Sequence, residues 1–448
     1  GGIWMLELDE TTGLRDYTVT YPVTYSSGSD AANQTSDPYF GKKIAGGYYV
    51  SGEGSYIEHI GNYYYLFISY GFFSPDGGYE MRIFRSERPD GPYVDAKNLS
   101  PVMTAYKMNY GPSATFNGGM KLMGGYQWDL MPKAEIAQGH NSAFTDREGR
   151  SYVVYHTKFN DGTLGHEVRV HQLFVNQDGW LVSVPFEYHN EMVSQAQVDS
   201  EESVGNEEIP GNYQLIAHNY KVKFDTMAYQ KPVNIVLTAS ADDPYSGTVS
   251  STYTSYSGTW TRIKGTDHVE MKLGSLICRG VLTRQTVDYS NIPAVCFSIV
   301  SSTGQGTTGA TAQREIWGVK ADAKAAIKYT LDNLTLPVKD QQEVTSNLSL
   351  PTTGKLGALV SWISSDESVL TSKGVVAGSG IIALTLNVNK DEYAYQKEYT
   401  LKVGDYMSIS DVQEDAAAER SVYDLLGRKV DRATRGIFIV DGKKVIIK

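Results

Sequence analysis

One carboxylate in the sequence stands where acid chemistry is possible, in the stretch SGEGSYIEHIGNYYYLFISYG at residues 51–71. Glu53 lies between Gly52 and Gly54, which free the backbone and let a large ligand approach without obstruction by side chains. The aromatic residues that follow would desolvate the carboxyl group and favour its neutral form. A neutral carboxylic acid near pH 7 can donate a proton to a leaving oxygen. The alternative is that Gly-Glu-Gly is an exposed turn with a solvated charge.

A second candidate, His140, occupies the same place in a repeated pattern. The segment GEGSYIEHIGNYYYLFISY (52–70) aligns with GHNSAFTDREGRSYVVYHT (139–157) at a constant offset. The alignment pairs Glu53 with His140, so both side chains are expected to face one cavity. An imidazole there can hold a cation through water or orient a catalytic group. A lone histidine is, however, more often a packed and hydrogen-bonded core residue.

The same alignment repeats a Glu-x-Arg pattern further along the chain. EMRIFRSERPDGPY (80–93) matches EVRVHQLFVNQDGW (167–180), so Arg82 corresponds to Arg169. Arg82 is a candidate to bind a substrate hydroxyl or to pair with Glu53. Arginines at such positions also commonly join adjacent strands through surface ion pairs, so this assignment has a structural alternative.

The composition favours an all-β protein of several domains. The chain has 448 residues, more than one hydrophobic core usually supports. Its 32 Tyr and 44 Gly indicate many short strands joined by tight turns. The net charge of -11 argues against a nucleic-acid partner, because a phosphate-binding surface needs clustered Lys and Arg. No run of about 18 or more apolar residues occurs, so no transmembrane helix is expected.

Each repeat unit has the features of a β-propeller blade. A blade has about 45 residues in four strands, and both units here end at an Asp-Gly turn near an aromatic residue. The innermost strand of each blade runs along the propeller axis, so corresponding residues converge on one end of the channel. The Gly-rich segment between the units (111–132) is either an irregular blade or a loop. Together these segments predict the C-terminal blades of a propeller over residues 1–192.

Three further regions are expected after the propeller. Residues 193–321 begin with an acidic segment and continue with alternating strands, which predicts a small β-barrel or sandwich domain. Residues 322–403 have the pattern of an immunoglobulin-like β-sandwich without its cysteines, with about seven short strands. Residues 404–448 predict a short β domain that ends in a Lys-rich strand.

The two cysteines, Cys278 and Cys296, have a spacing that fits neighbouring strands. Two sulfur atoms cannot form a metal site of four sulfur ligands. A disulfide and two buried thiols both remain open, and the thiols are favoured.

These residues together resemble glycoside hydrolase family 43, in particular its arabinanase-like branch with an extra C-terminal β domain. The resemblance covers roughly residues 1–320 and rests on GGIWMLELDETTG, GKKIAGGYYVSGEGSYIEHIGNYYYLFISYG, EMRIFRSERPDGPY, GHNSAF and HEVRVHQLFVNQDGWLVSVPFEY. It implies a five-bladed propeller and an inverting mechanism, in which an acid protonates the leaving oxygen while a separate base activates water. By motif, Glu53 corresponds to the general acid and His140 to the axial histidine that helps to hold a hydrated calcium ion.

The sequence departs from the family at the catalytic base. In this family the base and a third carboxylate come from earlier blades, whereas this chain opens on an expected outer strand and turn, GGIWMLELDETTG. The sequence is therefore expected to be a fragment that lacks the base and is inactive alone. No Asp within it is assigned that role.

The last two regions resemble modules of exported proteins. Residues 322–403 resemble the bacterial immunoglobulin-like modules that space domains on secreted enzymes. VYDLLGRKV and GIFIVDGKKVIIK resemble the C-terminal sorting domain of the type IX secretion system of Bacteroidetes. These resemblances imply a protein that is secreted or held at the surface of a Gram-negative bacterium of that kind.

The leading functional hypothesis is a secreted inverting glycoside hydrolase of α-1,5-linked arabinan or arabino-oligosaccharides. Glu53 would be the acid, His140 would lie at the calcium ion and Arg82 near the sugar. The partner would be a plant cell-wall polysaccharide, arabinan or arabinoxylan, and the protein is expected to be a monomer. Two alternatives are a β-xylosidase or α-L-arabinofuranosidase of the same fold, and a non-catalytic carbohydrate-binding surface protein whose aromatic residues stack on sugars.

Overall fold

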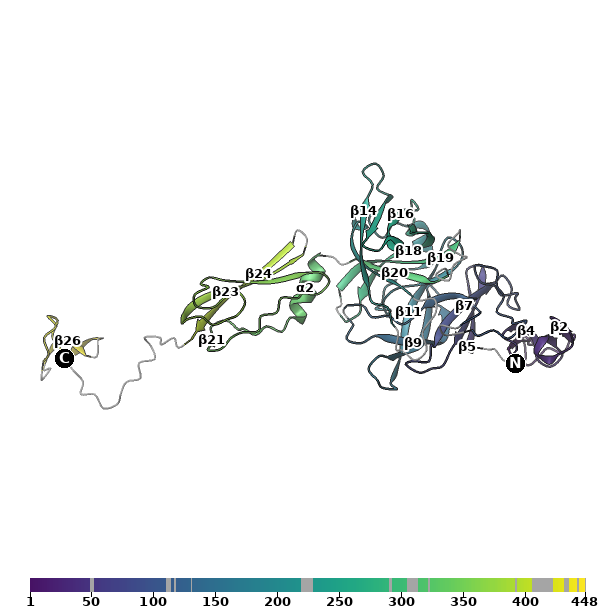
Figure 1. Cartoon of the computed structure of the whole chain (residues 1–448), viewed down its shortest axis with the longest axis horizontal. Helices are drawn as coiled ribbons and strands as arrows, with labels where there is room; N and C mark the ends of the chain where they lie inside the picture. The colour runs from purple at the N-terminus through teal and green to yellow at the C-terminus, as the bar shows by residue number, and fades with distance from the viewer. Residues whose placement is uncertain are drawn as a thin grey trace. The chain divides into compact units, whose positions relative to one another are not determined.

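The computed structural model describes the chain except at residues 49–51, 110–113, 117, 130, 219–228, 290–291, 304–312, 321–322, 391–392, 405–421, 431–434, 441–442 and 448. The described part is nearly all β, in agreement with the predicted fold class, and its strands form separate sheets and one closed barrel (Figure 1). Apart from single 3-10 turns, the helices of this described part are α1 (Gln195–Ser200) and α2 (Ala323–Asn333).

A small antiparallel sheet forms the start of the chain. Its strand order is β1-β4-β3-β2, with β1 at Ile3–Met5, β2 at Thr24–Tyr25, β3 at Gln34–Asp37 and β4 at Gly41–Ala45. The strand β1 lies at the edge of the sheet, and the turn after it is closed by Asp9, whose Oδ1 accepts the backbone N–H groups of Thr11 and Thr12. The predicted outer strand and turn are confirmed.

The two repeat units form two sheets of four strands each. The first has the order β5-β6-β7-β8 and the second β12-β11-β10-β9. Their bounds are β5 Glu53–Ile60, β6 Tyr63–Tyr70, β7 Glu80–Ser86 and β8 Met120–Met123, then β9 Glu135–Thr145, β10 Ser151–Phe159, β11 His166–Val175 and β12 Leu181–Ser183. The Gly-rich segment between the units thus supplies the fourth strand of the first sheet. The first strands of the two sheets, β5 and β9, lie next to each other.

Both first strands carry a β-bulge at the same place. On β5, Glu53 pairs with Ser69, but the next pair is formed by Tyr56, so the strand has one extra residue here. On β9, Gly139 pairs with His156, and an extra residue again separates this pair from the next one. A bulge twists the strand and re-aims the side chains beside it. The repeated bulge therefore positions Glu53 and His140 differently from ordinary strand residues.

The middle strands of both sheets are buried on both faces. On β6, Tyr65, Phe67 and Ile68 have no exposed surface although their side chains alternate in direction. Such burial is expected for a sheet packed between neighbours, as propeller blades are. The aromatic and β-branched residues of β6 thus serve mainly the core, whereas β5 is mostly exposed or half-buried.

The region after the blades forms a closed barrel of eight strands, β13 to β20 in sequence order. The strands are β13 Gly211–Ala217, β14 Val233–Ala239, β15 Ser246–Ser251, β16 Gly258–Arg262, β17 His268–Leu273, β18 Leu276–Val287, β19 Ile292–Thr303 and β20 Glu315–Lys320. The structure thus decides for a barrel over a sandwich. Cys278 and Cys296 are buried free thiols on β18 and β19, as favoured from the sequence.

The barrel is tied to the second blade by buried hydrogen bonds. Both oxygens of Glu315 on β20 accept from Ser183 on β12, from its backbone N–H at 2.6 Å and from its hydroxyl at 2.8 Å. Trp317 donates its indole N–H to the carbonyl oxygen of Ser183 at 2.9 Å. Residues Gly1–Thr335 accordingly belong to one compact unit, in which β18 of the barrel lies beside β11 of the second blade (Figure 1).

The remaining described strands form two small sheets. One has the order β21-β24-β23-β22, with β21 Gln342–Val344, β22 Leu359–Ser364, β23 Gly380–Lys390 and β24 Tyr393–Val403. The other has the order β25-β26-β27, with β25 Val422–Tyr423, β26 Gly436–Val440 and β27 Lys443–Ile447. The helix α2 lies in the region for which only strands were expected.

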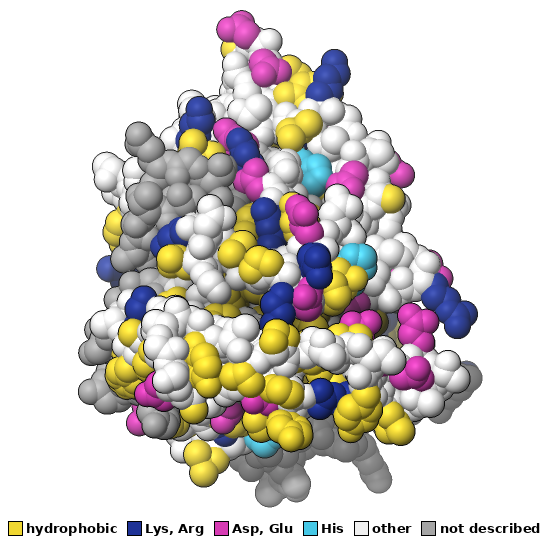
Figure 2. Space-filling model, turned by 90° about the vertical axis from the view of Figure 1, so that its right-hand side faces the viewer, with side chains coloured by type: hydrophobic (Ala, Val, Ile, Leu, Met, Phe, Trp, Pro, Cys, Tyr) yellow, Lys and Arg dark blue, Asp and Glu magenta, His cyan; other side chains and the backbone are white. Residues whose placement is uncertain are grey.

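The N-terminal part of the chain exposes many hydrophobic side chains, most of them in its loops and turns. Figure 2 shows this side of the molecule, with hydrophobic side chains gathered across the lower half of the view. Large exposed hydrophobic residues in this part of the chain are Leu8, Leu14, Tyr17, Val23, Tyr25, Tyr39, Phe40 and Tyr56. Among the residues that the structure describes, no helix combines the length and the apolar character needed to cross a membrane.

Candidate active site

Glu53 is the first residue of β5, and its side chain is exposed beside the bulge. The phenol of Tyr79 donates a hydrogen bond of 3.3 Å to Oε2 of Glu53. Tyr79 itself is 2% exposed and precedes β7. One carboxyl oxygen thus has a fixed partner inside the protein, while the group as a whole remains accessible to a ligand.

His140 lies directly beside this position on the neighbouring strand β9. Its backbone has φ 48°, in the left-handed region, and its N–H donates to Oγ of Ser69 at 2.7 Å. A Cβ atom on Gly54 would lie 2.8 Å from Cγ of His140, so this close approach requires glycine. The structure therefore brings Glu53 and His140 to one place, through their neighbours Gly54 and Ser69. The catalytic and metal-binding roles assigned to them remain predictions.

Two further histidines and a phenylalanine surround the pair. The ring centroid of His156 lies 5.7 Å from that of His140, 6.0 Å from that of His166 and 4.0 Å from that of Phe73. Tyr79 stacks on His156 at 6.1 Å with an angle of 15° between the rings. Burial, and then the nearby His140, lower the pKa of His156, which keeps this imidazole neutral at pH 7. The cluster offers ring faces and neutral polar atoms, as sugar-binding surfaces do.

The internal repeat of the sequence also points to these residues. The offset that pairs Glu53 with His140 also pairs Ser69 with His156 and Tyr79 with His166. The structure shows that these positions meet, so three equivalent positions of two successive blades form one polar cluster.

Arg82 lies elsewhere, in a buried ion-pair cluster on β7 and β8. Its guanidinium pairs with Oε1 of Glu80 at 3.0 Å, and Lys121 pairs with Oε2 of the same carboxylate at 2.8 Å. Burial works to raise the pKa of Glu80, but Arg82 and Lys121 hold it below its ordinary value. Burial lowers the pKa of Lys121 to about 8. The structure does not bring Arg82 to Glu53, and its proposed contact with substrate stays a prediction.

The equivalent Arg169 of the second blade is paired in a related way. It contacts Glu135 at 2.6 Å and Glu167 at 2.8 Å. Burial raises the pKa of Glu135 to about 7, although Arg169 acts against this rise. Both arginines of the repeat thus pair with carboxylates of their own sheets, but these pairs are buried and not at the surface, as the structural alternative had expected.

The described side chains do not form a binding site for a calcium ion by direct contact. Calcium prefers about six to eight oxygen ligands, whereas His140 offers an imidazole and its nearest polar rings are histidines. Within the described part of the chain, no group of three or more His, Cys, Asp or Glu side chains is placed to hold a metal ion. A calcium ion could contact His140 here only through its own water shell.

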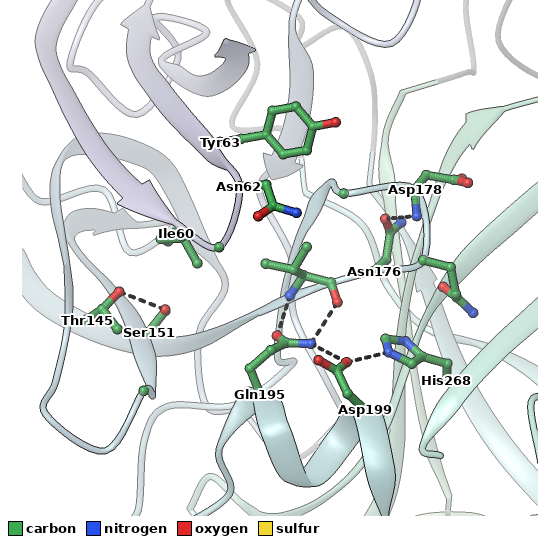
Figure 3. Close-up of a pocket in the computed structure, with 15 residues that line it drawn as sticks. Ile60, Asn62, Tyr63, Thr145, Ser151, Asn176, Asp178, Gln195, Asp199 and His268 are labelled. Atoms are coloured by element: carbon green, nitrogen blue, oxygen red, sulfur yellow. Dashed lines mark hydrogen bonds and ion pairs between the residues drawn. The ribbon is translucent and has the colours of Figure 1, made fainter. Parts of the chain in front are cut away.

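A separate polar cleft of about 630 Å³ lies at the other end of the blades, beside the hairpin turns at Gly61 and Gly149. Figure 3 shows that its side chains bind one another. Gln195 of α1 pairs with both backbone polar groups of Val175, at 2.7 and 3.0 Å, and Asp199 contacts Nε2 of His268 on β17 at 2.7 Å. Because these groups are already paired, the cleft is a junction between blade and barrel, away from Glu53.

Comparison with known families agrees with this architecture. The family model described as glycosyl hydrolases family 43 matches residues 26–181, which contain both four-stranded sheets, Glu53 and His140. Residues 26–181 belong to glycosyl hydrolases family 43. The closed barrel corresponds to a C-terminal lipocalin-like domain matched at residues 185–309, and residues 321–405 match an atrophied bacterial Ig domain.

Two curated proteins resemble about 70% of this chain. The extracellular endo-α-(1→5)-L-arabinanase 2 of Bacillus subtilis is 32% identical over 322 residues, which are 69% of this chain and 59% of that protein. The extracellular endo-α-(1→5)-L-arabinanase of Thermotoga petrophila is 32% identical over 333 residues, 72% of this chain and 60% of that protein. The chain thus spans about 60% of the length of these relatives.

Solved structures show the same likeness. The endo-1,5-α-L-arabinanase of Thermotoga petrophila RKU-1 aligns with a TM-score of 0.56 at 30% identity, covering 72% of this chain and 63% of that one. A family 43 glycoside hydrolase of Bacillus licheniformis aligns with a TM-score of 0.55 at 29% identity, covering 71% and 62%. The sheets of the family 43 segment are therefore propeller-like.

Proposed function

We propose that the protein hydrolyses α-1,5-linked arabinan or arabino-oligosaccharides and that Glu53 is its general acid. The observation that carries this proposal is the exposed Glu53 carboxyl group, held by one oxygen at the bulge of an inner strand in a family 43 segment. The names of the two curated relatives supply the substrate class. The rings of Phe73, His156 and His166 lie within reach of the same place and suit the apolar faces of a sugar.

In the proposed reaction Glu53 gives its proton to the glycosidic oxygen as the bond from this oxygen to the anomeric carbon breaks. An inverting enzyme needs a second carboxylate about 6.5 to 9.5 Å away, which takes a proton from the attacking water. Among the interactions of the described residues, Glu53 has no contact with a second carboxylate. The identity of the base stays a prediction from the family resemblance.

Two further parts of the proposal rest on resemblance alone. One is a calcium ion that contacts His140 through water; no step above depends on it, because the described side chains do not coordinate such an ion. The other is export to the surroundings or surface of a Gram-negative Bacteroidetes-type bacterium, directed by a type IX sorting tail at residues 404–448. Cell fractionation with and without this tail tests the second part.

Product analysis on linear 1,5-α-arabinan beside xylan tests the activity. The complete gene product should release arabinose or arabino-oligosaccharides and leave xylan intact. Release from xylan alone would favour the xylosidase alternative. Binding of arabinan without any release would favour the non-catalytic alternative.

The Glu53→Gln variant tests the role of the acid. It should keep the fold and lose turnover of substrates with poor leaving groups, while aryl arabinosides with activated leaving groups lose less, because they need little protonation. The control is Glu148→Gln, which changes a carboxylate 66% exposed in the second blade. Equal losses on both kinds of substrate, or no loss, would remove Glu53 from this role.

A further inference from the structure

Two hydrogen bonds link the candidate acid and its surroundings across the two blades. The N–H of His140 donates to Oγ of Ser69 at 2.7 Å, and the phenol of Tyr79 donates to Oε2 of Glu53 at 3.3 Å. Gly139, next to His140, packs against both the Ser69 hydroxyl and the Tyr79 ring. Ser69 and Tyr79 are 1% and 2% exposed, so both side chains are shielded from water.

The direction of the bond between Tyr79 and Glu53 follows from the chemistry of the carboxylate. An ionised carboxylate has no proton to give, so Tyr79 donates and Oε2 of Glu53 accepts. Burial raises the pKa of Tyr79 to about 12, so the phenol keeps this proton at neutral pH.

We infer that Tyr79 is a positioning residue that fixes which oxygen of Glu53 carries the catalytic proton. Because Oε2 already accepts from Tyr79, the proton of the neutral acid is assigned to the other oxygen, Oε1. This inference rests on the proposed role of Glu53 as general acid. When the Oε1 proton moves to the glycosidic oxygen and the bond to the anomeric carbon breaks, Glu53 becomes a carboxylate. The Tyr79 proton stays on the phenol, and its hydrogen bond becomes charge-assisted and stronger.

The surrounding packing holds Tyr79 in this position. A Cβ atom on Gly139 would lie 2.6 Å from Cε1 of Tyr79 and 2.7 Å from Oγ of Ser69, so these groups pack directly against the backbone of β9. The rings of Phe73 and His156 contact the Tyr79 ring at 5.3 and 6.1 Å. Since the ring is held by packing, Tyr79→Phe removes the hydroxyl with little other change.

The control variant is Tyr65→Phe in the same sheet. Tyr65 has no exposed surface and donates its hydroxyl to the carbonyl oxygen of Gly179 at 2.7 Å, at the far end of β6. Both variants lose one buried phenol hydrogen bond, so both should lose a similar amount of stability. Only Tyr79→Phe should affect Glu53.

The first measurement is the ¹³C NMR signal of the Glu53 carboxyl carbon in the 448-residue chain, which needs no activity. The signal is assigned by its disappearance in Glu53→Gln. It should move in Tyr79→Phe, move less in Ser69→Ala and stay in place in Tyr65→Phe. An unmoved signal in Tyr79→Phe would overturn the inference.

The second measurement is the kinetics of the complete gene product. Tyr79→Phe should lower kcat about tenfold on poor leaving groups and leave KM nearly unchanged, as expected for one lost bond to a developing charge. A raised KM with unchanged kcat, or equal losses in Tyr79→Phe and Tyr65→Phe, would reduce Tyr79 to a structural residue. If Glu53→Gln retains full activity on poor leaving groups, the proposed function itself fails, whatever Tyr79→Phe shows.

Discussion

The backbone N–H of His140 donates a 2.7 Å hydrogen bond to the hydroxyl of Ser69, which joins the first strand of one blade to the second strand of the other. Ser69 also stands opposite Glu53 in the β5–β6 register. The candidate acid is therefore positioned from two blades at once. We expect substitutions that change the packing between the blades to shift the Glu53 carboxyl group, even when the substituted residue does not contact it.

Gly54→Ala tests this packing. Gly54 has φ +51°, and a Cβ atom there would lie 2.7 Å from Cα of His140. Gly61→Ala is the matched control, because Gly61 has φ +60° and open space around it. We expect about 1 kcal/mol of destabilisation for Gly61→Ala from backbone strain alone, and about 2–4 kcal/mol for Gly54→Ala, where overpacking adds to it. Chemical unfolding of both variants measures the difference, and equal losses would contradict the close contact.

Arg82→Met distinguishes a structural role from a substrate role for Arg82. The side chain is 5% exposed and pairs with Glu80, so its loss should destabilise the protein by about 3 kcal/mol or more. Arg88→Met removes a cation that is 72% exposed and paired with Asp90, and should cost less than about 1 kcal/mol. Unfolding midpoints and KM are measured together. Unchanged stability with a raised KM would restore Arg82 as a substrate ligand.

Glu135 is expected to make stability depend on pH. Burial raises its pKa from the ordinary 4.5 to about 7, against the effect of Arg169. The folded protein therefore binds more protons than the unfolded chain between these values, so the free energy of unfolding falls as pH rises from about 4.5 to about 7. The loss is on the order of 3 kcal/mol, at about 1.4 kcal/mol per pKa unit. Glu135→Gln should flatten this slope, whereas the exposed Glu148→Gln should leave it; an equal slope in wild type and Glu135→Gln would contradict the prediction.

His140→Ala tests the calcium proposal. If a hydrated ion contacts His140, the variant should retain less calcium after dialysis and turn over arabinan more slowly, while its unfolding midpoint changes little because the side chain is exposed. Elemental analysis of the purified complete gene product gives the metal content. Equal calcium content and activity in both proteins would leave His140 without a role in metal binding.

The repeat allowed the two sheets and the pairing of Glu53 with His140 to be predicted from the sequence. Equivalent positions of a repeated hairpin keep the same register, because the alternation of buried and exposed residues fixes it. The bond that Ser69 accepts from His140 and the bond that Tyr79 donates to Glu53 could not be predicted in this way. Ser69 and Tyr79 lie in an aromatic, buried segment whose composition is explained by the core alone. Only the packing of the two blades shows where their hydroxyl groups point.

The role of Arg82 was less predictable, since its environment depends on Lys121. That lysine comes from the Gly-rich segment between the repeats, where no alternation marked the strand β8. The helix α2 was missed for a related reason. Its sequence AKAAIKYTLDN stands at the beginning of a region dominated by strand patterns. The Ala residues in this short segment favour a helix, but the strand patterns that follow conceal this local preference.

The bonds between Ser183 and Glu315 bear on how the chain can be divided. A cut after Ser183 would expose the apolar surface of the second blade that faces the barrel. It would also leave the buried carboxyl group of Glu315 without its hydrogen-bond donors. The compact unit that contains the two blade sheets also contains the whole barrel, together with Pro351–Ser361 and Asn387–Gln396. For protein engineering, the barrel should therefore be kept with the two blade sheets in any shortened version of the chain.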